Sequence, residues 1–446
     1  MNQETGNPKS SSMEDDARDI HRGESSAPSN LSIGVVIGRT SEFFDFFVYG
    51  IASVLVFPRL MFPFVDGETN RILCSFAIFS LAFVARPFGS LLFMWVDRAY
   101  GRGTKLTIAL FLLGGSTAAV AFLPSYDDYG VAVIVMLAIF RIIQGVALGG
   151  AWDGLASLSA LNAPANQRGW YAMIPQLGAP IGFALAAALF CYFVGNLSDE
   201  DFLSWGWRYP LFVAFTINVV ALFARLRIVA TPAFEQALIE RELEPRFVWE
   251  TIRTQGKEIL IGSFVPLAAF ATIYLVTIFP LSWSVATDKR GPADMLLWQV
   301  GASVLAVLGI ILSGLLADRI GRSRELLFGA LLIALFAFAA PFLLSLGEAG
   351  QNVFLLVGFF VLGISFGQSS GAVATRFAPA FRYTASAFTS DIAWLIGAAF
   401  APLIVLALAA HLGIWAIGAY LLSGAVCTAL ALLLSRSQDP AGSVAR

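Results

Sequence analysis

Residues 97–102 read Asp97-Arg98-Ala99-Tyr100-Gly101-Arg102, and they follow a long apolar run. Residues 318–322 read Asp318-Arg319-Ile320-Gly321-Arg322, and they follow a second apolar run in the other half of the chain. Both are basic loops between hydrophobic segments, which indicates an internal duplication. In a chain this apolar, such a duplication is typical of a membrane transporter built from two similar halves.

The composition supports that interpretation. Hydrophobic residues make up 58% of the 446 residues and charged residues only 13%, whereas a soluble protein has roughly a quarter of its residues charged. One core cannot bury this much apolar surface, because a soluble protein still needs a polar exterior. Lipid must therefore solvate much of the chain. The formal net charge of −2 gives no reason to expect a nucleic-acid partner.

Residue types that bind metals or form nucleophilic centres are sparse. Cys74, Cys191 and Cys427 lie far apart in apolar runs, without metal-binding or disulfide spacing. His21 falls in a polar tail, and His411 lies near the end of a predicted helix. The chain has no sequence cluster of His, Cys and carboxylates, no nucleophile elbow and no phosphate loop. We therefore expect no enzymatic activity, no metal and no cofactor.

The hydrophobic segments predict a helical membrane protein. A spanning helix needs about 20 mostly apolar residues, and about twelve segments meet that rule. They are 31–57, 72–96, 105–123, 131–157, 170–194, 209–226, 259–285, 296–317, 326–346, 352–375, 384–409 and 413–434. The sequence thus predicts an all-α polytopic membrane protein, with twelve transmembrane helices in two six-helix, pseudo-symmetric halves.

The expected domain organisation follows from these spans. In chain order we predict a disordered cytoplasmic tail, a six-helix bundle, a cytoplasmic central loop, a second six-helix bundle and a second cytoplasmic tail. Their residues are 1–30, 31–227, 228–258, 259–435 and 436–446, respectively.

Lys and Arg in short loops predict the orientation, because they favour the cytoplasmic side of a membrane. The basic loops all fall on one side, and they carry Arg98, Arg102, Lys105, Arg168, Arg319, Arg322, Arg324 and Arg382. The opposite loops are mainly acidic, with Asp127, Asp128, Asp199, Glu200, Asp201 and Glu348. Both termini are therefore predicted to be cytoplasmic.

Ionisable side chains inside predicted spans are the candidates for function, since each costs roughly 2.5–3.5 kcal/mol to insert. The first helix carries Arg39, Glu42 and Asp45, with Tyr49 four residues further on, and this spacing places neighbours on one surface. Arg141 lies at a similar depth in the fourth helix. We expect Glu42 or Asp45 to pair with Arg141 across a cavity, and protonation of the carboxylate to loosen the pair. A permanent structural ion pair is the alternative.

Two other helices carry notable residues. Gly145 and Gly149 in the fourth helix form a stripe of small residues, which favours close helix packing. Asp153 follows four residues later, and it could be a proton carrier, a gate partner or a solvated charge at the helix end. The eleventh helix carries Asp391, with Trp394 three residues further on.

These observations give two sets of candidate residues. The candidates for substrate binding and proton coupling are Arg39, Glu42, Asp45, Tyr49, Arg141, Gln144, Trp152, Asp153, Gln176, Asp391 and Trp394. The aromatic members could equally face lipid or pack in the core. In the basic loops, Asp caps a turn or pairs with a neighbouring helix, Gly permits the turn and Arg holds the cytoplasmic face. The candidate gating residues are Arg86, Asp97, Arg98, Arg102, Asp318, Arg319 and Arg322.

Several motifs resemble the major facilitator superfamily, and within it the metabolite:proton symporter family, which includes transporters of shikimate, 2-oxoglutarate, citrate, and proline or betaine. The resemblance covers residues 31–435. It rests on Glu42-Phe43-Phe44-Asp45-Phe46-Phe47-Val48-Tyr49-Gly50, Ala85-Arg86-Pro87-Phe88-Gly89, Arg141-Ile142-Ile143-Gln144-Gly145, Pro175-Gln176-Leu177-Gly178, Ser204-Trp205-Gly206-Trp207-Arg208 and Gly314-Leu315-Leu316-Ala317-Asp318-Arg319-Ile320-Gly321-Arg322. It implies that Glu42, Asp45, Arg141 and Gln144 handle substrate and protons.

The chain departs from the family pattern at a few positions. Where the family usually has Gly-Gly-Glu and an aromatic residue, this chain has Gly149-Gly150-Ala151-Trp152, and the acid stands at Asp153. Met94 replaces a Gly before the first basic loop, and Asp97 arrives one residue early. Arg376 stands where the family often has Glu, and Asp391 where a Gln is common.

The predicted function is secondary active transport. The resemblance implies proton-coupled uptake of a small organic acid or zwitterionic metabolite, by alternating access, across the bacterial inner membrane. Arg39, Arg141 or Arg376 could attract a carboxylate while Asp45 or Glu42 carries the proton. We expect a monomer in the lipid bilayer, with the substrate and protons as its partners and no nucleic acid. An exporter or exchanger of a related metabolite and a transport-inactive membrane sensor are the alternatives.

Overall fold

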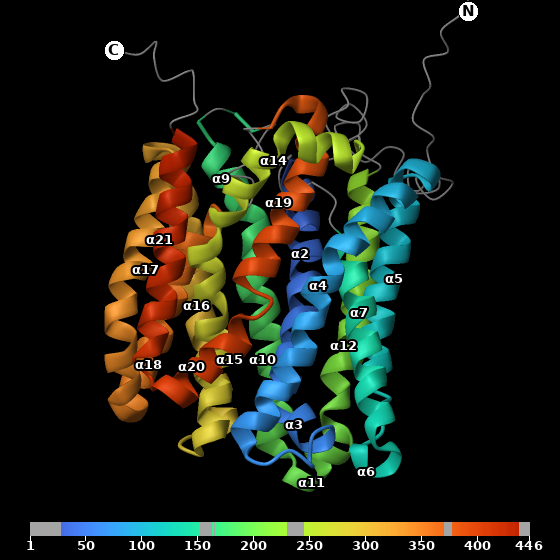
Figure 1. Ribbon diagram of the computed structural model, residues 1–446, viewed down its shortest axis with the longest axis vertical. Coiled ribbons are helices and arrows are strands. Elements are labelled where there is room, and N and C mark those ends of the chain that lie inside the picture. Colours follow the sequence, from blue (N-terminus) through green and yellow to red (C-terminus); the bar gives the residue numbers. More distant parts are fainter. Residues whose placement is uncertain (1–27, 152–162, 165, 230–244, 370–376, 437–446) are drawn as a thin grey trace, which may run out of the picture.

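The computed structural model describes residues 28–151, 163–164, 166–229, 245–369 and 377–436. Within these residues the chain is helical and has no β-strand. The long helices stand side by side in an elongated bundle (Figure 1). In the described part of the chain, eleven helical segments are long and apolar enough to cross a membrane, and the charged α2 is a further long helix. The predicted all-α polytopic fold is confirmed.

The long helices follow one another in two sets. The first half contributes α2 (Pro28–Leu55), α4 (Glu68–Tyr100), α5 (Arg102–Val120), α7 (Val131–Ala151), α9 (Arg168–Met173) with α10 (Gly178–Asn196), and α12 (Arg208–Val229). The second half contributes α14 (Val248–Phe264) with α15 (Leu267–Thr287), α16 (Pro292–Ile320), α17 (Arg322–Ser345), α18 (Gly347–Gly367), α19 (Arg382–Gly397) with α20 (Ala401–Leu412), and α21 (Ala416–Arg436). Short helical turns are α3 (Phe57–Leu60), α6 (Tyr126–Tyr129), α11 (Asp199–Asp201), η1 (Ile174–Leu177), η2 (Phe202–Gly206) and η4 (Pro379–Phe381).

Three predicted spans are broken rather than continuous, and proline accounts for each break. Pro175 lies at the start of η1, between α9 and α10. Pro266 caps the start of α15, and Pro402 lies in the first turn of α20. Proline lacks a backbone N–H and is tolerated at the start of a helix, so a new helix begins at each of these points. The helix before the break at Pro266, α14, begins at Val248. Its first residues therefore lie inside the predicted central loop, 228–258.

The two basic loops adopt the same turn. Gly101 (φ 84°) ends α4 and precedes α5, and Gly321 (φ 88°) ends α16 and precedes α17. Glycine adopts a positive φ without the steric cost that a side chain would bring. The repeated motif in the sequence therefore corresponds to a repeated turn in the structure.

The predicted stripe of small residues, Gly145 and Gly149, serves close helix packing. A Cβ atom added to Gly145 of α7 would lie 2.2 Å from the carbonyl oxygen of Ala82 in α4. In the second half, a Cβ atom on Gly363 of α18 would lie 2.3 Å from the carbonyl oxygen of Ala306 in α16. Both halves therefore bring two backbones into contact at matching places.

Replacing Gly145 with Ala is expected to destabilise the protein by about 1–3 kcal/mol, because two packed backbones must separate to admit the methyl group. Gly115→Ala is the matched control, since a Cβ atom there meets nothing within 4 Å. Thermal unfolding of the two purified variants in detergent is the measurement. Equal midpoints for the two variants would contradict this account of the α4–α7 contact.

Candidate functional site

Asp45 is a buried carboxylate held by a neighbouring helix. It accepts a 2.7 Å hydrogen bond from Nδ2 of Asn218 in α12. Ser41 of α2 in turn donates a 2.8 Å hydrogen bond to Oδ1 of Asn218, which fixes the orientation of the amide. The second carboxylate oxygen of Asp45 is buried and has no hydrogen-bond partner. The carboxylate is therefore held in place through one oxygen, while the other oxygen has no hydrogen bond. That second oxygen can bind a proton or a polar ligand atom.

Arg141 stands at the midpoint of α7 and is 2% exposed. Its Nε donates to the carbonyl oxygen of Phe79 at 2.9 Å, and its Nη1 donates to Oε1 of Gln144 at 3.0 Å. The guanidinium carbon lies 4.0 Å from the ring centroid of Tyr49. Gln144 itself donates to Thr117 of α5 at 2.8 Å. The Nη2 atom of Arg141 is buried without a partner, so it can donate to an anionic ligand.

The expected pairing of Glu42 or Asp45 with Arg141 is wrong for the described residues. Glu42 makes ion pairs with Arg39 and with Arg225 of α12, and Asp45 is bound by Asn218. The contact between Arg39 and Glu42 could be expected from the sequence, because residues three apart are neighbours on a helix surface. What the prediction lacked was the position of α12, which packs against α2.

Arg225 ties three helices of the first half together. Besides Glu42, it binds the carbonyl oxygen of Ala151 at the end of α7 at 2.5 Å, and that of Gly38 in α2 at 3.1 Å. Asn218 and Arg225 were both missed by the sequence analysis. Their seven-residue spacing equals about two helical turns, which places them on one face of the helix. Two polar residues on one face of an apolar span were the signal that could have identified them.

Further buried polar atoms without partners lie in the interior of the bundle. They are the hydroxyl groups of Tyr49 and Tyr274 and Oε1 of Gln176. Tyr274 belongs to α15 in the second half, and its ring lies 5.5 Å from that of Phe46 in α2. Buried polar groups are almost always hydrogen-bonded in proteins, so these atoms are candidates to contact a substrate.

Aromatic rings join the two halves around these groups. Trp394 of α19 stacks on Phe270 of α15 with ring centroids 4.3 Å apart, and lies 6.1 Å from Phe83 of α4 in a stacked arrangement. Phe46 contacts Trp394 at 6.0 Å. Trp394 is thus at the interface between the halves. Trp152, Asp153 and Arg376, which the sequence analysis also singled out, lie outside the described residues.

Asp391 belongs to an ion pair between the two halves. Arg86 of α4 contacts it through Nε at 2.8 Å, and Ser90 donates to its other oxygen at 2.5 Å. The Asp391 side chain is only 1% exposed. The structure thus joins a residue predicted for gating, Arg86, to a residue predicted for substrate or proton binding. The pair connects α4 with α19.

A first-half latch, formed by Asp97, Arg102 and Lys105 with Tyr383, makes a second contact between the halves. Arg102 pairs with Asp97 at 2.8 Å. Lys105 donates to the hydroxyl of Tyr383 at 2.9 Å, and that hydroxyl lies 3.4 Å from Asp97. The guanidinium carbon of Arg102 lies 4.5 Å from the Tyr383 ring centroid. Tyr383 is in the first turn of α19, so these interactions cross from the first half to the second.

A second-half latch, formed by Asp318 with Gly169 and Trp170, is its counterpart. The backbone N–H groups of Gly169 and Trp170, in the first turn of α9, donate to the Asp318 carboxylate at 2.6 and 3.1 Å. Gln368 donates to the carbonyl oxygen of Gly169 at 3.0 Å and accepts from Arg322 at 3.0 Å. A carboxylate at a helix N-terminus is favoured by the free N–H groups and the helix dipole.

Of the other predicted gating residues, one contacts an aromatic ring and one is exposed. Arg98 lies over the ring of Phe247, with its guanidinium carbon 4.9 Å from the centroid. Arg319 is exposed in the last turn of α16.

Within the described residues, His, Cys, Asp and Glu form no group that could hold a metal ion.

The spanning helices, the buried ionisable groups at mid-depth and the ion pair and hydrogen bonds between the two halves define a polytopic membrane transporter. The family model described as Major Facilitator Superfamily matches residues 41–402. The chain belongs to that superfamily, and it is a transporter rather than an enzyme.

Named relatives are similar over nearly the whole chain. The inner membrane metabolite transport protein YhjE of Escherichia coli is 36% identical over 91% of this chain and 94% of its own length. The shikimate transporter of Escherichia coli is 31% identical over 92% and 95% of the two chains. The structure of the proton:xylose symporter XylE bound to 6-bromo-6-deoxy-D-glucose has a TM-score of 0.68 at 19% identity, covering 92% of this chain and 96% of that one. That likeness supports the fold.

Proposed function

We propose that this chain is a proton-coupled symporter that takes up a small organic acid or zwitterionic metabolite across the bacterial inner membrane. The observation that carries the proposal is the buried Asp45 carboxylate, with one oxygen held by Asn218 and the other without a partner. An intramembrane carboxylate in this condition is suited to bind and release a proton during transport.

The neighbouring Arg141 supplies the substrate contact. Its Nη2 is buried without a partner, while Phe79, Gln144 and Tyr49 hold the rest of the guanidinium. Arg141 therefore binds the substrate carboxylate, and Asp45 carries the proton. Glu42 has a different role, because two guanidinium groups hold it. It maintains the packing of α2 against α12.

The contacts between the halves support alternating access. Both latches join the two halves near the basic loops, and the Arg86–Asp391 pair joins α4 to α19 deeper in the bundle. All three contacts must break for the site to open on the side of the basic loops. Basic loops favour the cytoplasm, and both termini are accordingly cytoplasmic. The transporter works as a monomer, in which the two bundles rock around the central site.

Uptake measurements test the coupling. Proteoliposomes that contain the purified protein are expected to accumulate a labelled carboxylate when the exterior is made acidic, because proton entry drives substrate entry. The measurement is repeated with a protonophore, which should reduce the internal concentration to that outside. Accumulation of a transported acid that ignores the proton gradient would refute the symport proposal.

A further inference from the structure

Glu325, in the first turn of α17, is a buried acid that the proposed transport cycle does not use. It is 0% exposed. Ser313 of α16 donates a 2.6 Å hydrogen bond to its Oε1, and its Oε2 is buried without a hydrogen-bond partner. Within the described part of the chain, no ion pair joins this carboxylate to a cation. Burying an ionised carboxylate in this way is costly, whereas its protonated form carries no charge.

Most other buried acids are compensated by a cation. Asp97 and Asp391 each contact an arginine. Among the buried acids of the described ranges, Asp45 alone shares the pattern of Glu325: an uncharged side chain binds one oxygen, and the other oxygen is buried without a partner. The second half therefore contains a carboxylate in the same condition as the one to which we assign the coupled proton.

Glu325 lies beside the second-half latch. It follows Arg322 by three residues, as Lys105 follows the arginine of the first basic turn. Arg322 donates to Gln368, and Gln368 donates to the carbonyl oxygen of Gly169 in the first half. Residues three apart are neighbours on a helix surface. The buried acid is therefore about one helical turn from a contact between the two halves.

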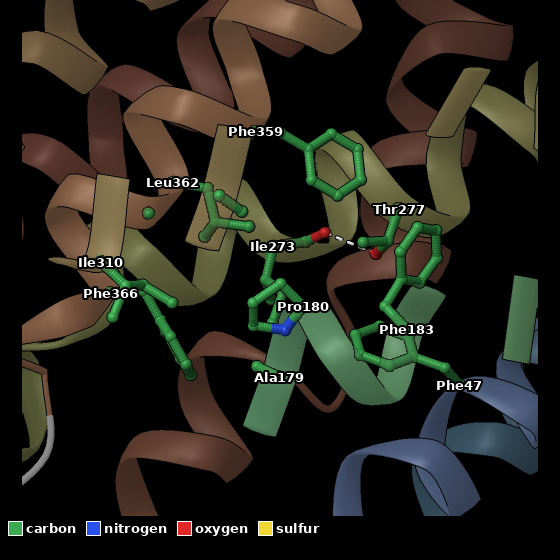
Figure 2. A pocket seen from close by; sticks show the side chains of 12 residues that line it. Phe47, Ala179, Pro180, Phe183, Ile273, Thr277, Ile310, Phe359, Leu362 and Phe366 are labelled. Carbon is green, nitrogen blue, oxygen red and sulfur yellow. Dashed lines mark hydrogen bonds between the residues drawn. The ribbon is translucent and has the colours of Figure 1, made fainter. Parts of the chain in front are cut away.

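The end of α18 covers the hydroxyl group that binds this acid. Beside a small apolar cavity between the halves, Figure 2 shows Ile310 of α16 next to Phe366 of α18. Ser313 lies three residues after Ile310, and a Cβ atom added to Gly367 would lie only 2.6 Å from the Ser313 hydroxyl. The residue after Gly367 makes the contact with the first half. A movement of the end of α18 away from the first half therefore disturbs the packing over the acid.

The charged groups around the acid do not neutralise it by direct contact. Arg322 is the cation that acts on it, and Asp318 of α16 shares the charge of the same guanidinium. The other arginines of the adjoining turns are exposed, so water screens them, and they are Arg168, Arg319 and Arg324. The helices α15, α18 and α21 also pack against α17. Their described side chains are uncharged except for Glu348, which lies at the opposite end of α18.

We infer that Glu325 is a second proton-binding site, which takes a proton from the cytoplasm when the second-half latch closes and returns it to the cytoplasm when that latch opens. The inference rests on the proposed function for the orientation and for alternating access. On closing, the carboxylate ion and one H⁺ form a neutral acid, and on opening the acid loses the same proton to water. No net charge crosses the membrane at this site, in contrast to Asp45. Glu325 thus controls how readily the cytoplasmic side opens.

Spin-label distances between the halves test the inference. Tyr100→Cys at the end of α4 and Ile320→Cys at the end of α16 place one label on each half, at exposed positions, after the three native cysteines have been replaced. An Asp45→Asn background removes the other proton site. Because the closed form binds one more proton, the ratio of open to closed molecules should rise with pH, by up to about tenfold per pH unit.

Glu325→Gln should abolish that pH dependence and favour the closed form, because the amide stays neutral at every pH. Glu348→Gln is the matched control, since Glu348 is an exposed acid, and it should keep the dependence. Thermal unfolding identifies any variant that has lost its fold. If Glu325→Gln folds and opens with pH as Glu348→Gln does, the inference is wrong.

Ser313→Ala tests the same site without changing the acid. The Ser313 hydroxyl donates to the carboxylate, so its removal should disfavour the ionised form and extend the pH-dependent range of opening to higher pH. A purely structural role of Ser313 would instead change the ratio of open to closed molecules by the same factor at every pH. That second result would overturn the assignment of the proton to Glu325.

Uptake by proteoliposomes separates this inference from the proposed function. Glu325→Gln should change the rate of uptake but not the final accumulation of substrate. A lower final accumulation would show that the Glu325 proton crosses the membrane, which would refute this inference and leave symport intact. Loss of pH-dependent opening in Glu325→Gln, together with uptake that ignores the proton gradient, would support this inference and refute symport.

Discussion

The Asp45→Asn variant is expected to lose proton-driven accumulation of substrate while keeping its fold. Asn has nearly the same shape and can still accept the hydrogen bond from Asn218, but it cannot carry a proton. A pH difference of one unit is worth about 1.4 kcal/mol, or about tenfold accumulation for one coupled proton. The variant should therefore equilibrate the substrate rather than concentrate it.

Counterflow separates coupling from transport. Asp45→Asn proteoliposomes loaded with unlabelled substrate should still exchange it for labelled substrate, because that exchange needs no net proton movement. Asp127→Asn is a matched control, since Asp127 is an exposed acid in a loop. It should accumulate substrate as the unchanged protein does. Full accumulation of substrate by Asp45→Asn would show that another residue binds the coupled proton.

Removing one partner of the Arg86–Asp391 pair should have the second large effect. Arg86→Ala leaves the Asp391 carboxylate, 1% exposed, without its cation. Breaking a buried pair in this way costs about 3–5 kcal/mol, because an uncompensated charge remains. The variant can avoid that cost by separating α4 from α19, so we expect both a lower unfolding midpoint and impaired uptake.

The double variant Arg86→Ala with Asp391→Ala distinguishes an ion pair from general packing. With both charges gone, no buried ion remains unpaired, so its loss of stability should be smaller than the sum of the two single losses. Arg319→Ala is the control for the loss of an arginine charge outside the pair, because Arg319 is exposed, and it should have little effect. Additive losses from Arg86 and Asp391 would show that the pair contributes nothing beyond its separate contacts.

The sequence predicted the helices well because hydrophobic length decides whether a segment can span a membrane. The breaks at Pro266 and Pro402 were harder to locate, since the hydrophobic run continues across them. The turns at Gly101 and Gly321 were predictable from a repeated local motif.

The partners of the buried charges could not be predicted, because they come from distant parts of the chain. Arg86 and Asp391 are 305 residues apart in sequence, and no helical periodicity reports such a contact. Asp45 is buried in the structure. Its partner Asn218 comes from α12, whose polar face, Asn218 and Arg225, the sequence analysis overlooked. The prediction chose Arg141 as the partner of Asp45 because the two have opposite charges. In the structure the side-chain amide of Asn218 is the partner.

The unlike chemistry of the two latches limits which substitutions each can tolerate. Gly169 and Tyr383 each follow an arginine at the start of a helix, α9 and α19. Asp318 contacts main-chain atoms, so the side chain at Trp170 can vary without removing a donor. The contact of Lys105 with Tyr383 requires a phenol, and a tyrosine at Gly169 would collide with Ala317, whose Cβ atom lies 2.7 Å from the position of an added Cβ. The two latches have thus diverged to the point that the residues of one could not take the place of those of the other.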